Sequence, residues 1–318
     1  MTGTIAQATR SMRPVVAELL AELGERHPDL VVLAADARAL TMPFQRRYPR
    51  RFFDVGIAEA NLVGVASGLA RAGHRVVVAA MAPFLIRRAA EQLRIDVCGA
   101  ALDVTLLGVG GGLSYGTLGA THHAAEDLGA AAAMPGMRVF CPADVHDAAW
   151  AVAESVAGSG PAYVRLSARE EPVVHDPAQR FHIDEPAVLG AGPGAVVVAA
   201  GATVAEALRA VEIAGPQGAT AQVLALTAVA PFPQAAVRRI AGGAGVVITV
   251  EDHYAAGGLA AHTALALAGR WTGRLVPLAV DHRPAPVADR AGLFRFYGID
   301  APAVARALIE SDPLRREC

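Results

Sequence analysis

This chain has few cysteines and a small net charge. It has only three cysteines, Cys98, Cys141 and Cys318, which stand far apart and form no CxxC pair. This spacing argues against a disulfide framework or a zinc site, and it predicts two buried small apolar residues and one terminal thiol. The formal net charge is −2 over 318 residues. So weak a charge gives no general attraction to nucleic acid or to an anionic membrane surface.

Long hydrophobic runs are also missing. Arg, Asp, Glu or His interrupts each Ala/Val-rich stretch before it is long enough to span a bilayer. The first residues, MTGTIAQATRSMRP, lack the apolar core of a signal peptide. We therefore expect a cytoplasmic protein that has neither a membrane nor a nucleic acid as its partner.

Hydrophobic residues themselves are plentiful, at 53% of the chain, and they alternate between short β-rich runs and longer helical stretches. This alternation is typical of parallel sheets that helices cover on both faces. A polar, Pro-containing run, AREEPVVHDPAQRFHIDEP, interrupts the pattern. We predict an α/β fold of two doubly wound domains, 1–170 and a smaller 187–318, joined by a linker at 171–186.

The expected strands can be placed from the apolar runs. Those of the first domain fall at 30–36, 75–80, 103–109, 138–141 and 162–166. Those of the second fall at 195–201, 221–227, 245–252 and 275–281, and helices begin at Val204, Gln234 and Gly257. In doubly wound sheets ligands gather at the carboxyl ends of the strands, so a functional site is expected in the loops that follow them.

One acidic residue stands out in the segment RFFDVGIAEANLVGVASG, from Arg51 to Gly68. Glu59 lies at the head of an otherwise apolar, small-residue helix that follows a short strand, so we expect its carboxyl group to be buried. Burial disfavours the ionised form of a carboxyl group. Glu59 is therefore either a helix-start residue favoured by the helix dipole, or a carboxyl group kept for chemistry with a partner from outside the chain.

Three other features are candidates for a site. Gly110 opens a run of three glycines, where the backbone turns tightly or approaches a neighbour closely, but the spacing is not that of a GxGxxG fingerprint. His122 precedes a helix and is either a hydrogen-bonded structural residue or a functional one; typical metal-ligand spacing is lacking. Phe84 is either a core aromatic or a flat surface on which a ring can stack.

Together these segments resemble the C-terminal half of transketolase, which is the pyrimidine-binding domain of thiamine diphosphate enzymes followed by the transketolase C-terminal domain. The resemblance covers nearly the whole chain in order. The matching strings are RFFDVGIAEAN, APFLIRRAAEQLR, GLSYGTLGATHHAAEDL, MPGMRVFCPAD, GPAYVRLS, VVITVEDHYAAGGL and FYGID.

The resemblance implies roles for several side chains. In such enzymes the glutamate of the GIAE motif, matched here by Glu59, hydrogen-bonds N1′ of the aminopyrimidine and so promotes loss of the thiazolium C2 proton. Phe84 matches an aromatic residue that stacks on the pyrimidine, and Met81 stands where a second aromatic is common. Arg87 is assigned to cofactor binding as well. His122 is expected to contact the donor's oxygen or to shuttle a proton, which makes it a catalytic and a substrate-binding candidate.

The resemblance also implies a partner chain. Thiamine diphosphate enzymes hold the diphosphate through Mg²⁺ bound by a GDG motif, and this sequence contains no GDG. We therefore predict no metal ligands in this chain. The Mg²⁺ site should lie on a separate subunit that resembles the transketolase N-terminal half, in an α2β2 heterotetramer with sites at subunit interfaces.

Departures from the family pattern bear on the substrate. Gly110 replaces a histidine and Leu118 replaces an aspartate, and both of the missing residues normally contact sugar hydroxyls or phosphate. Arg10 matches a phosphate-contacting position. The arginine near the end of RLSAR is shifted, which leaves the roles of Arg165 and Arg169 open. The loss of polar partners suggests a specialised acceptor.

We predict the C-terminal subunit of a two-component transketolase-like transferase that moves a two-carbon ketol unit from a ketose donor to an acceptor. One alternative is a 2-oxoacid dehydrogenase β-subunit, which shares the architecture and also needs a second chain. Another is a non-catalytic scaffold or regulatory subunit with a decayed site. Met81, Gly110 and Leu118 favour decay, whereas retention of Glu59 argues against it.

Overall fold

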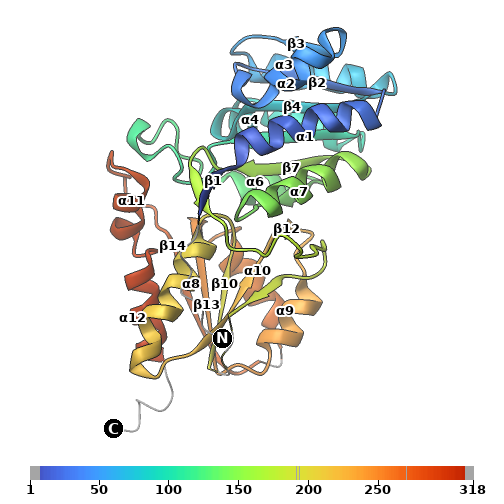
Figure 1. Cartoon of the computed structure of the whole chain (residues 1–318). Helices are drawn as coiled ribbons and strands as arrows, with labels where there is room; N and C mark the ends of the chain where they lie inside the picture. Colours follow the sequence, from blue (N-terminus) through green and yellow to red (C-terminus); the bar gives the residue numbers. More distant parts are fainter. Residues whose placement is uncertain (1–7, 191, 193, 270, 312–318) are drawn as a thin grey trace.

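The computed structural model describes residues 8–190, 192, 194–269 and 271–311, and it shows two α/β lobes, one above the other in Figure 1. Cys318, expected as a terminal thiol, lies outside these residues. Cys98 and Cys141 are buried and free of disulfides, as the sequence predicts. Within the described ranges, no helix is both long and apolar enough to cross a membrane.

The upper lobe is built on a seven-stranded sheet of order β12-β6-β7-β5-β4-β2-β3. All neighbouring pairs are parallel except β12 with β6. The strands are β2 (Leu30–Ala34), β3 (Phe52–Asp54), β4 (Arg75–Met81), β5 (Val104–Val109), β6 (Arg138–Phe140), β7 (Ala162–Leu166) and β12 (Ala228–Ala230).

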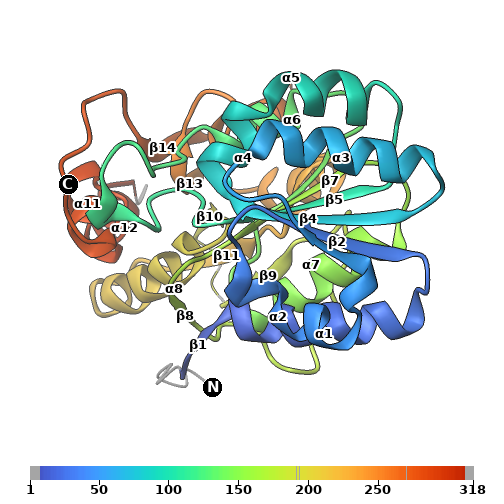
Figure 2. The same cartoon turned by 90° about the horizontal axis from the view of Figure 1, so that it is seen from above.

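Helices cover both faces of this sheet, as Figure 2 shows. Alternate residues of β2 enter different cores: Val31 and Leu33 pack on the face of α3 and α4, and Leu30 and Val32 on the face of α1 and α7. The helices are α1 (Met12–Arg26), α2 (Arg38–Arg47), α3 (Glu59–Arg71), α4 (Ala82–Arg88), α5 (Ala90–Gln92), α6 (Asp127–Ala132) and α7 (Val145–Ala157), with the short turns η1 (Pro49–Arg51), η2 (Leu93–Cys98, a π-helix) and η3 (Gly116–Leu118).

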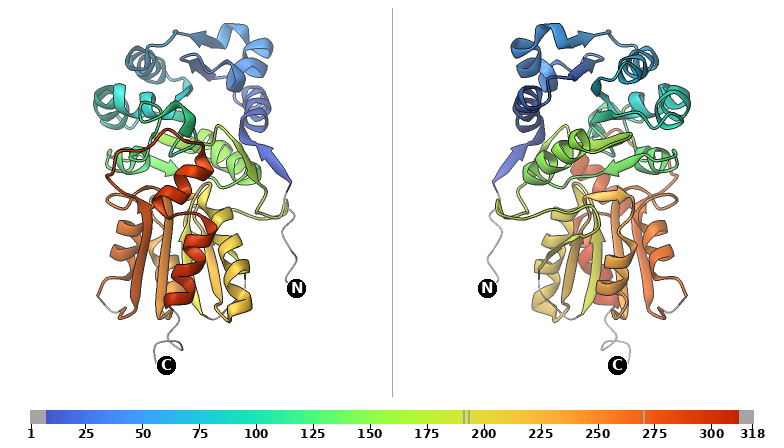
Figure 3. Two further views of the ribbon diagram at one scale, coloured as in Figure 1. Left: turned by 90° about the vertical axis from the view of Figure 1, so that its left-hand side faces the viewer. Right: turned by 90° about the vertical axis from the view of Figure 1, so that its right-hand side faces the viewer.

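The lower lobe has a five-stranded sheet of order β14-β13-β10-β11-β9, in which only the edge strand β9 is antiparallel. Helices α8, α11 and α12 pack on one face and α9 and α10 on the other (Figure 3). The elements are β9 (Ala187–Leu189), β10 (Ala195–Ala199), α8 (Thr203–Ala214), η4 (Gly215–Gln217), β11 (Ala221–Ala225), α9 (Gln234–Ala241), β13 (Val246–Tyr254), α10 (Leu259–Leu267), β14 (Arg274–Val280), α11 (Arg290–Tyr297) and α12 (Ala301–Ser311).

Two pairings tie the lobes together in ways the sequence pattern did not indicate. Strand β12 comes from the second half of the chain but joins the sheet of the first, beside β6. Near the start of the predicted linker, β8 (Glu170–Pro172) pairs antiparallel with β1 (Thr9–Ser11). The expected strands are otherwise confirmed, with ends that differ by at most two residues.

The predicted linker is also held by a buried carboxylate. Asp144 caps α7 by accepting hydrogen bonds from the backbone N–H groups of His146 and Asp147, and it accepts others from Val174 and His175. Burial alone would raise the pKa of Asp144. The side-chain hydrogen bond and the charge of His175, together with the backbone hydrogen bonds, outweigh this effect and lower the pKa to about 2. Because this folded pKa is depressed, the stabilisation is present at neutral pH and is lost only as the pH falls from about 4 towards 2.

Candidate active site

Glu59 is the first residue of α3 and follows the loop after β3. It is 4% exposed, which confirms the expected burial of this carboxyl group. Nη1 of Arg88 donates a hydrogen bond to Oε2 of Glu59 over 3.2 Å. Among the described residues no other side chain or backbone group donates to this carboxylate, so Oε1 is left available. The chain thus supplies one partner for Glu59 that the sequence did not predict.

The strand-to-helix turn after β4 explains how Arg88 reaches Glu59. Pro83 lies in the first turn of α4, where its missing N–H costs no helical bond. Phe84 and Arg88 are four residues apart, so they share one face of α4. Cζ of Arg88 lies 3.9 Å from the centroid of the Phe84 ring, a cation–π contact. Arg87 instead pairs with Glu126 at 3.7 Å, and its assignment to cofactor binding stays a prediction.

Backbone conformation and packing explain why the loop after β5 has a glycine at position 110. Gly110 has φ +79°, a left-handed conformation that favours glycine. A side chain at this position would also overlap the ring of Tyr115. The Tyr115 ring therefore occupies the space in which a larger residue would start. Sequence reasoning missed Tyr115, although an aromatic residue within a glycine-rich loop was a signal that could have found it.

Replacing Gly110 with alanine should lower the free energy of unfolding by about 2 kcal/mol, because the left-handed backbone and the overlap with Tyr115 both disfavour a side chain. Urea unfolding measures this loss. Gly136→Ala is the matched control, since Gly136 has φ +69° but nothing near its would-be Cβ. An equal loss of unfolding free energy in the two variants would show that the Tyr115 ring moves aside at no cost, which would contradict the packing argument.

His122 stands beside both aromatic residues. Its ring lies 5.2 Å from that of Phe84 and 6.2 Å from that of Tyr115, edge-on in both cases. Oγ1 of Thr121 is 2.9 Å from Nδ1, which fixes one ring nitrogen. No hydrogen bond from a described residue engages Nε2, so that nitrogen is available to a ligand. His122 thus contacts Phe84, and Arg88 contacts both Phe84 and Glu59. The structure therefore brings His122, Phe84 and Glu59 into one cluster.

The other predicted residues are more spread out. Met81 is the last residue of β4 and half-buried, and Leu118 is 51% exposed on η3. Arg169 is exposed, and its Nε donates to the carbonyl oxygen of Ser114 in the glycine loop over 3.2 Å. Arg10 is exposed on β1, opposite Glu171 of β8, and no contact among the described residues links it to the cluster around Glu59.

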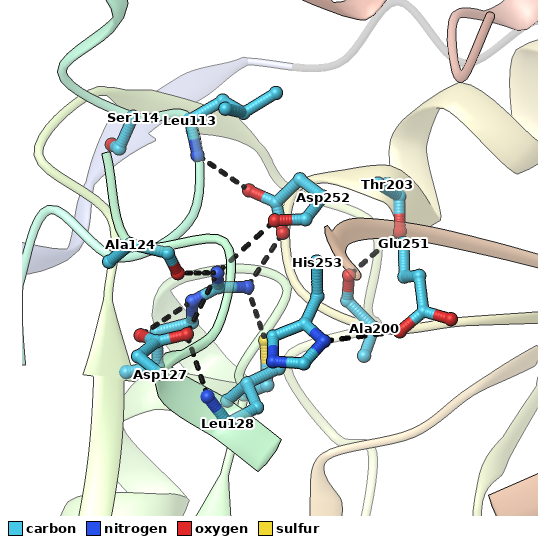
Figure 4. A network of polar contacts seen from close by, with 12 residues as sticks. Leu113, Ser114, Ala124, Asp127, Leu128, Ala200, Thr203, Glu251, Asp252 and His253 are labelled. Carbon is cyan, nitrogen blue, oxygen red and sulfur yellow. Dashed lines mark hydrogen bonds and ion pairs between the residues drawn. The ribbon is translucent and has the colours of Figure 1, made fainter. Parts of the chain in front are cut away.

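Arg165 has a different place from Arg169. It is buried on β7, where Nη1 lies 2.6 Å from Oδ1 of Asp252 and Nη2 lies 3.0 Å from Oδ1 of Asp127. Figure 4 shows these two carboxylates, Asp127 and Asp252, in one network of polar contacts. Burial would lower the pKa of Arg165, but the two carboxylates raise it well above its usual value. Since Asp252 comes from β13 and Asp127 from α6, this cation joins the two lobes. Arg165 has no group left to bind a substrate phosphate.

Further polar contacts link the two lobes near Arg165. Nε2 of His253 accepts a hydrogen bond from the backbone N–H of Gly129 over 3.0 Å, so this buried side chain ties β13 to α6. Burial lowers the pKa of His253 and favours its neutral form. Nη2 of Arg290 donates to Oε2 of Glu171 over 3.0 Å. Within the described part of the chain, no three His, Cys, Asp or Glu side chains are grouped as metal ligands.

Two known family models match successive parts of the chain. Residues 8–172 match the family "Transketolase, pyrimidine binding domain". Residues 185–304 match "Transketolase, C-terminal domain". The family resemblance and the α/β fold class predicted from the sequence are thereby confirmed.

Individual relatives are similar over most of their length. An apulose-4-phosphate transketolase subunit of Phocaeicola vulgatus is 31% identical over 92% of this chain and 95% of its own. The 6-deoxy-6-sulfo-D-fructose transketolase subunit SqwH of Clostridium sp. strain MSTE9 is 34% identical over 78% of each chain. A split-gene transketolase solved as an inactive beta4 tetramer superposes with a TM-score of 0.86 at 31% identity, over 96% of this chain and 98% of its own.

These relatives are transketolase subunits rather than whole enzymes, which confirms the prediction of a transferase subunit that works with a partner. The two family matches together leave only short segments of the chain uncovered. The chain therefore belongs to the transketolase family and comprises its pyrimidine-binding and C-terminal domains.

Proposed function

We propose that this chain is the C-terminal subunit of a two-component, thiamine diphosphate-dependent transketolase that transfers a two-carbon ketol unit from a ketose donor to an acceptor. One observation carries the proposal: the carboxylate of Glu59 is buried, yet its Oε1 has no hydrogen-bond donor among the described residues. A ring nitrogen that shares a proton with this oxygen would satisfy it. The adjacent Phe84 ring offers a stacking surface, so the site fits the aminopyrimidine.

Each residue of the cluster has a distinct task in this proposal. Thiamine diphosphate, when bound, supplies a thiazolium carbon that can attack a carbonyl group. Glu59 would hold the ring nitrogen by a hydrogen bond and exchange a proton with it. Phe84 and Met81 would contact the ring faces. Nε2 of His122, left open because Thr121 holds Nδ1, donates or accepts a proton at the reacting oxygen.

The second half of the cofactor site belongs to another subunit in this proposal. The chain lacks a GDG motif, and its described residues show no grouped metal ligands. A partner chain resembling the transketolase N-terminal half would therefore bind Mg²⁺ and the diphosphate, in an α2β2 assembly in the cytoplasm. The domain limits 1–170 and 187–318, with the linker between them, are part of the same proposal.

We further propose that the acceptor is specialised. Gly110 cannot be replaced by the usual histidine without displacing Tyr115, and Leu118 offers no polar group. A polyol phosphate would thus find fewer hydrogen-bond partners than in a typical transketolase. Arg169 is exposed and tied to the glycine loop, so it is the candidate for an anionic group of the substrate, with Arg10 as a second.

Reconstitution tests the proposed function. The chain is mixed with its cognate N-terminal-half subunit, Mg²⁺ and thiamine diphosphate, and aldehyde acceptors are screened with a ketose donor. Products two carbons longer than the acceptor, formed only when both chains are present, are the expected result. Release of CO₂ from a 2-oxoacid without ketol transfer would favour the 2-oxoacid dehydrogenase alternative. Comparable turnover of unmodified pentose phosphates would contradict the specialised acceptor.

A further inference from the structure

The guanidinium group of Arg88 lies where two features of the site meet. It stacks on Phe84, with Cζ 3.9 Å from the ring centroid, and it donates to Oε2 of Glu59 over 3.2 Å. Both contacts follow from one helix, because Phe84 and Arg88 share a face of α4. A single flat, cationic N–H donor thus bridges the aromatic ring and the buried carboxylate.

This arrangement has the chemistry that the proposed function assigns to the aminopyrimidine. That ring is also flat, also stacks on Phe84 and also shares a proton with Glu59. The guanidinium bonds Oε2 and the ring nitrogen would bond Oε1, so the two groups do not compete for one oxygen. They compete for space, since an aromatic face with a carboxylate at its edge accommodates one planar group at a time. The arrangement also gives the buried charge of Glu59 a counter-ion from its own chain.

We propose that Arg88 is a placeholder in the cofactor site: it lies on Phe84 beside Glu59 and must leave that place when the aminopyrimidine binds. This inference rests on the proposed function and deepens it. The Arg88 side chain is 52% exposed, so it can move into solvent without being released from a core. The Arg88 end of the ion pair is exposed although Glu59 is buried, so solvent screens the pair, and a cation–π contact is weak; the displacement therefore lowers cofactor affinity only moderately.

The test is the affinity of the reconstituted two-chain complex for thiamine diphosphate in Mg²⁺, measured by calorimetry. Arg88→Met keeps the apolar stem and removes the guanidinium, so it should bind the cofactor about five- to tenfold more tightly than the parent chain. Arg94→Met is the matched control. It removes another exposed arginine that bonds a glutamate, Glu91, over 3.2 Å, and it should leave the affinity unchanged.

The outcomes separate this inference from the proposed function. If the parent complex binds the cofactor and Arg88→Met binds it equally or more weakly, the placeholder role is wrong and the proposed function stands. If neither the parent complex nor any variant binds thiamine diphosphate, the proposed function fails and the placeholder role fails with it. Thermal melting of Arg88→Met and Arg94→Met, expected to match the parent chain, shows that both variants fold.

Discussion

Replacing Glu59 with glutamine should reduce ketol transfer by the reconstituted complex about 10²- to 10⁴-fold, the usual contribution of a positioned proton-transfer group. Glutamine keeps the size of the side chain and can hydrogen-bond, but it cannot exchange a proton with a ring nitrogen. The loss should fall on turnover, because the remaining contacts to the substrate are unchanged. Steady-state kinetics with saturating Mg²⁺ and cofactor measure it.

Glu91→Gln is the matched control for Glu59→Gln. Glu91 is exposed and pairs with Arg94, so its replacement should leave turnover unchanged. Assembly with the partner chain should survive in both variants. Full activity of Glu59→Gln would contradict the role of this carboxylate, and it would favour a scaffold subunit in which the fold persists without chemistry.

Replacing Arg165 with methionine should lower the free energy of unfolding by about 3–5 kcal/mol. Methionine fills much of the same space, but it leaves the buried carboxylates of Asp127 and Asp252 facing each other without a cation. Part of Asp127 remains satisfied, since the hydroxyl group of Tyr163 donates to its Oδ2 over 2.7 Å. Urea unfolding followed by far-ultraviolet circular dichroism measures the loss.

Arg169→Met controls for the removal of an arginine from the same segment. Arg169 is exposed, so its replacement should change stability by less than about 0.5 kcal/mol. A double variant, Arg165→Met with Asp252→Asn, should recover part of the loss by removing one stranded charge. Equal stability of Arg165→Met and the parent chain would show that the two lobes do not depend on this ionic junction.

Much of the fold could be predicted from the sequence because its strands are buried on both faces. Runs such as 75–80 and 195–201 are apolar almost throughout, and only a parallel sheet between two helical layers accommodates them. Glu59 was also predictable, since an acidic residue at the head of an apolar helix stands out in any composition. These features are local, and local patterns are what a single sequence displays.

The contacts that complete the site and the junction are not local. Arg88 meets Glu59 from another helix, whereas the sequence pointed to its neighbour Arg87, because the phase of this helix could not be read from the sequence. Tyr115 could be related to Gly110 only by the path of the loop. Arg165 joins Asp252 across 87 positions of sequence, and no periodicity encodes such a pairing.

We propose that this chain holds one half of a cofactor site and that a partner subunit holds the other half. Native mass spectrometry of the tagged chain, isolated from its own host with Mg²⁺ and thiamine diphosphate present, tests it most directly. We expect a complex of two copies of this chain and two copies of a second chain, with bound cofactor. A homo-oligomer that carries no cofactor, even after the cognate partner is added, would contradict it.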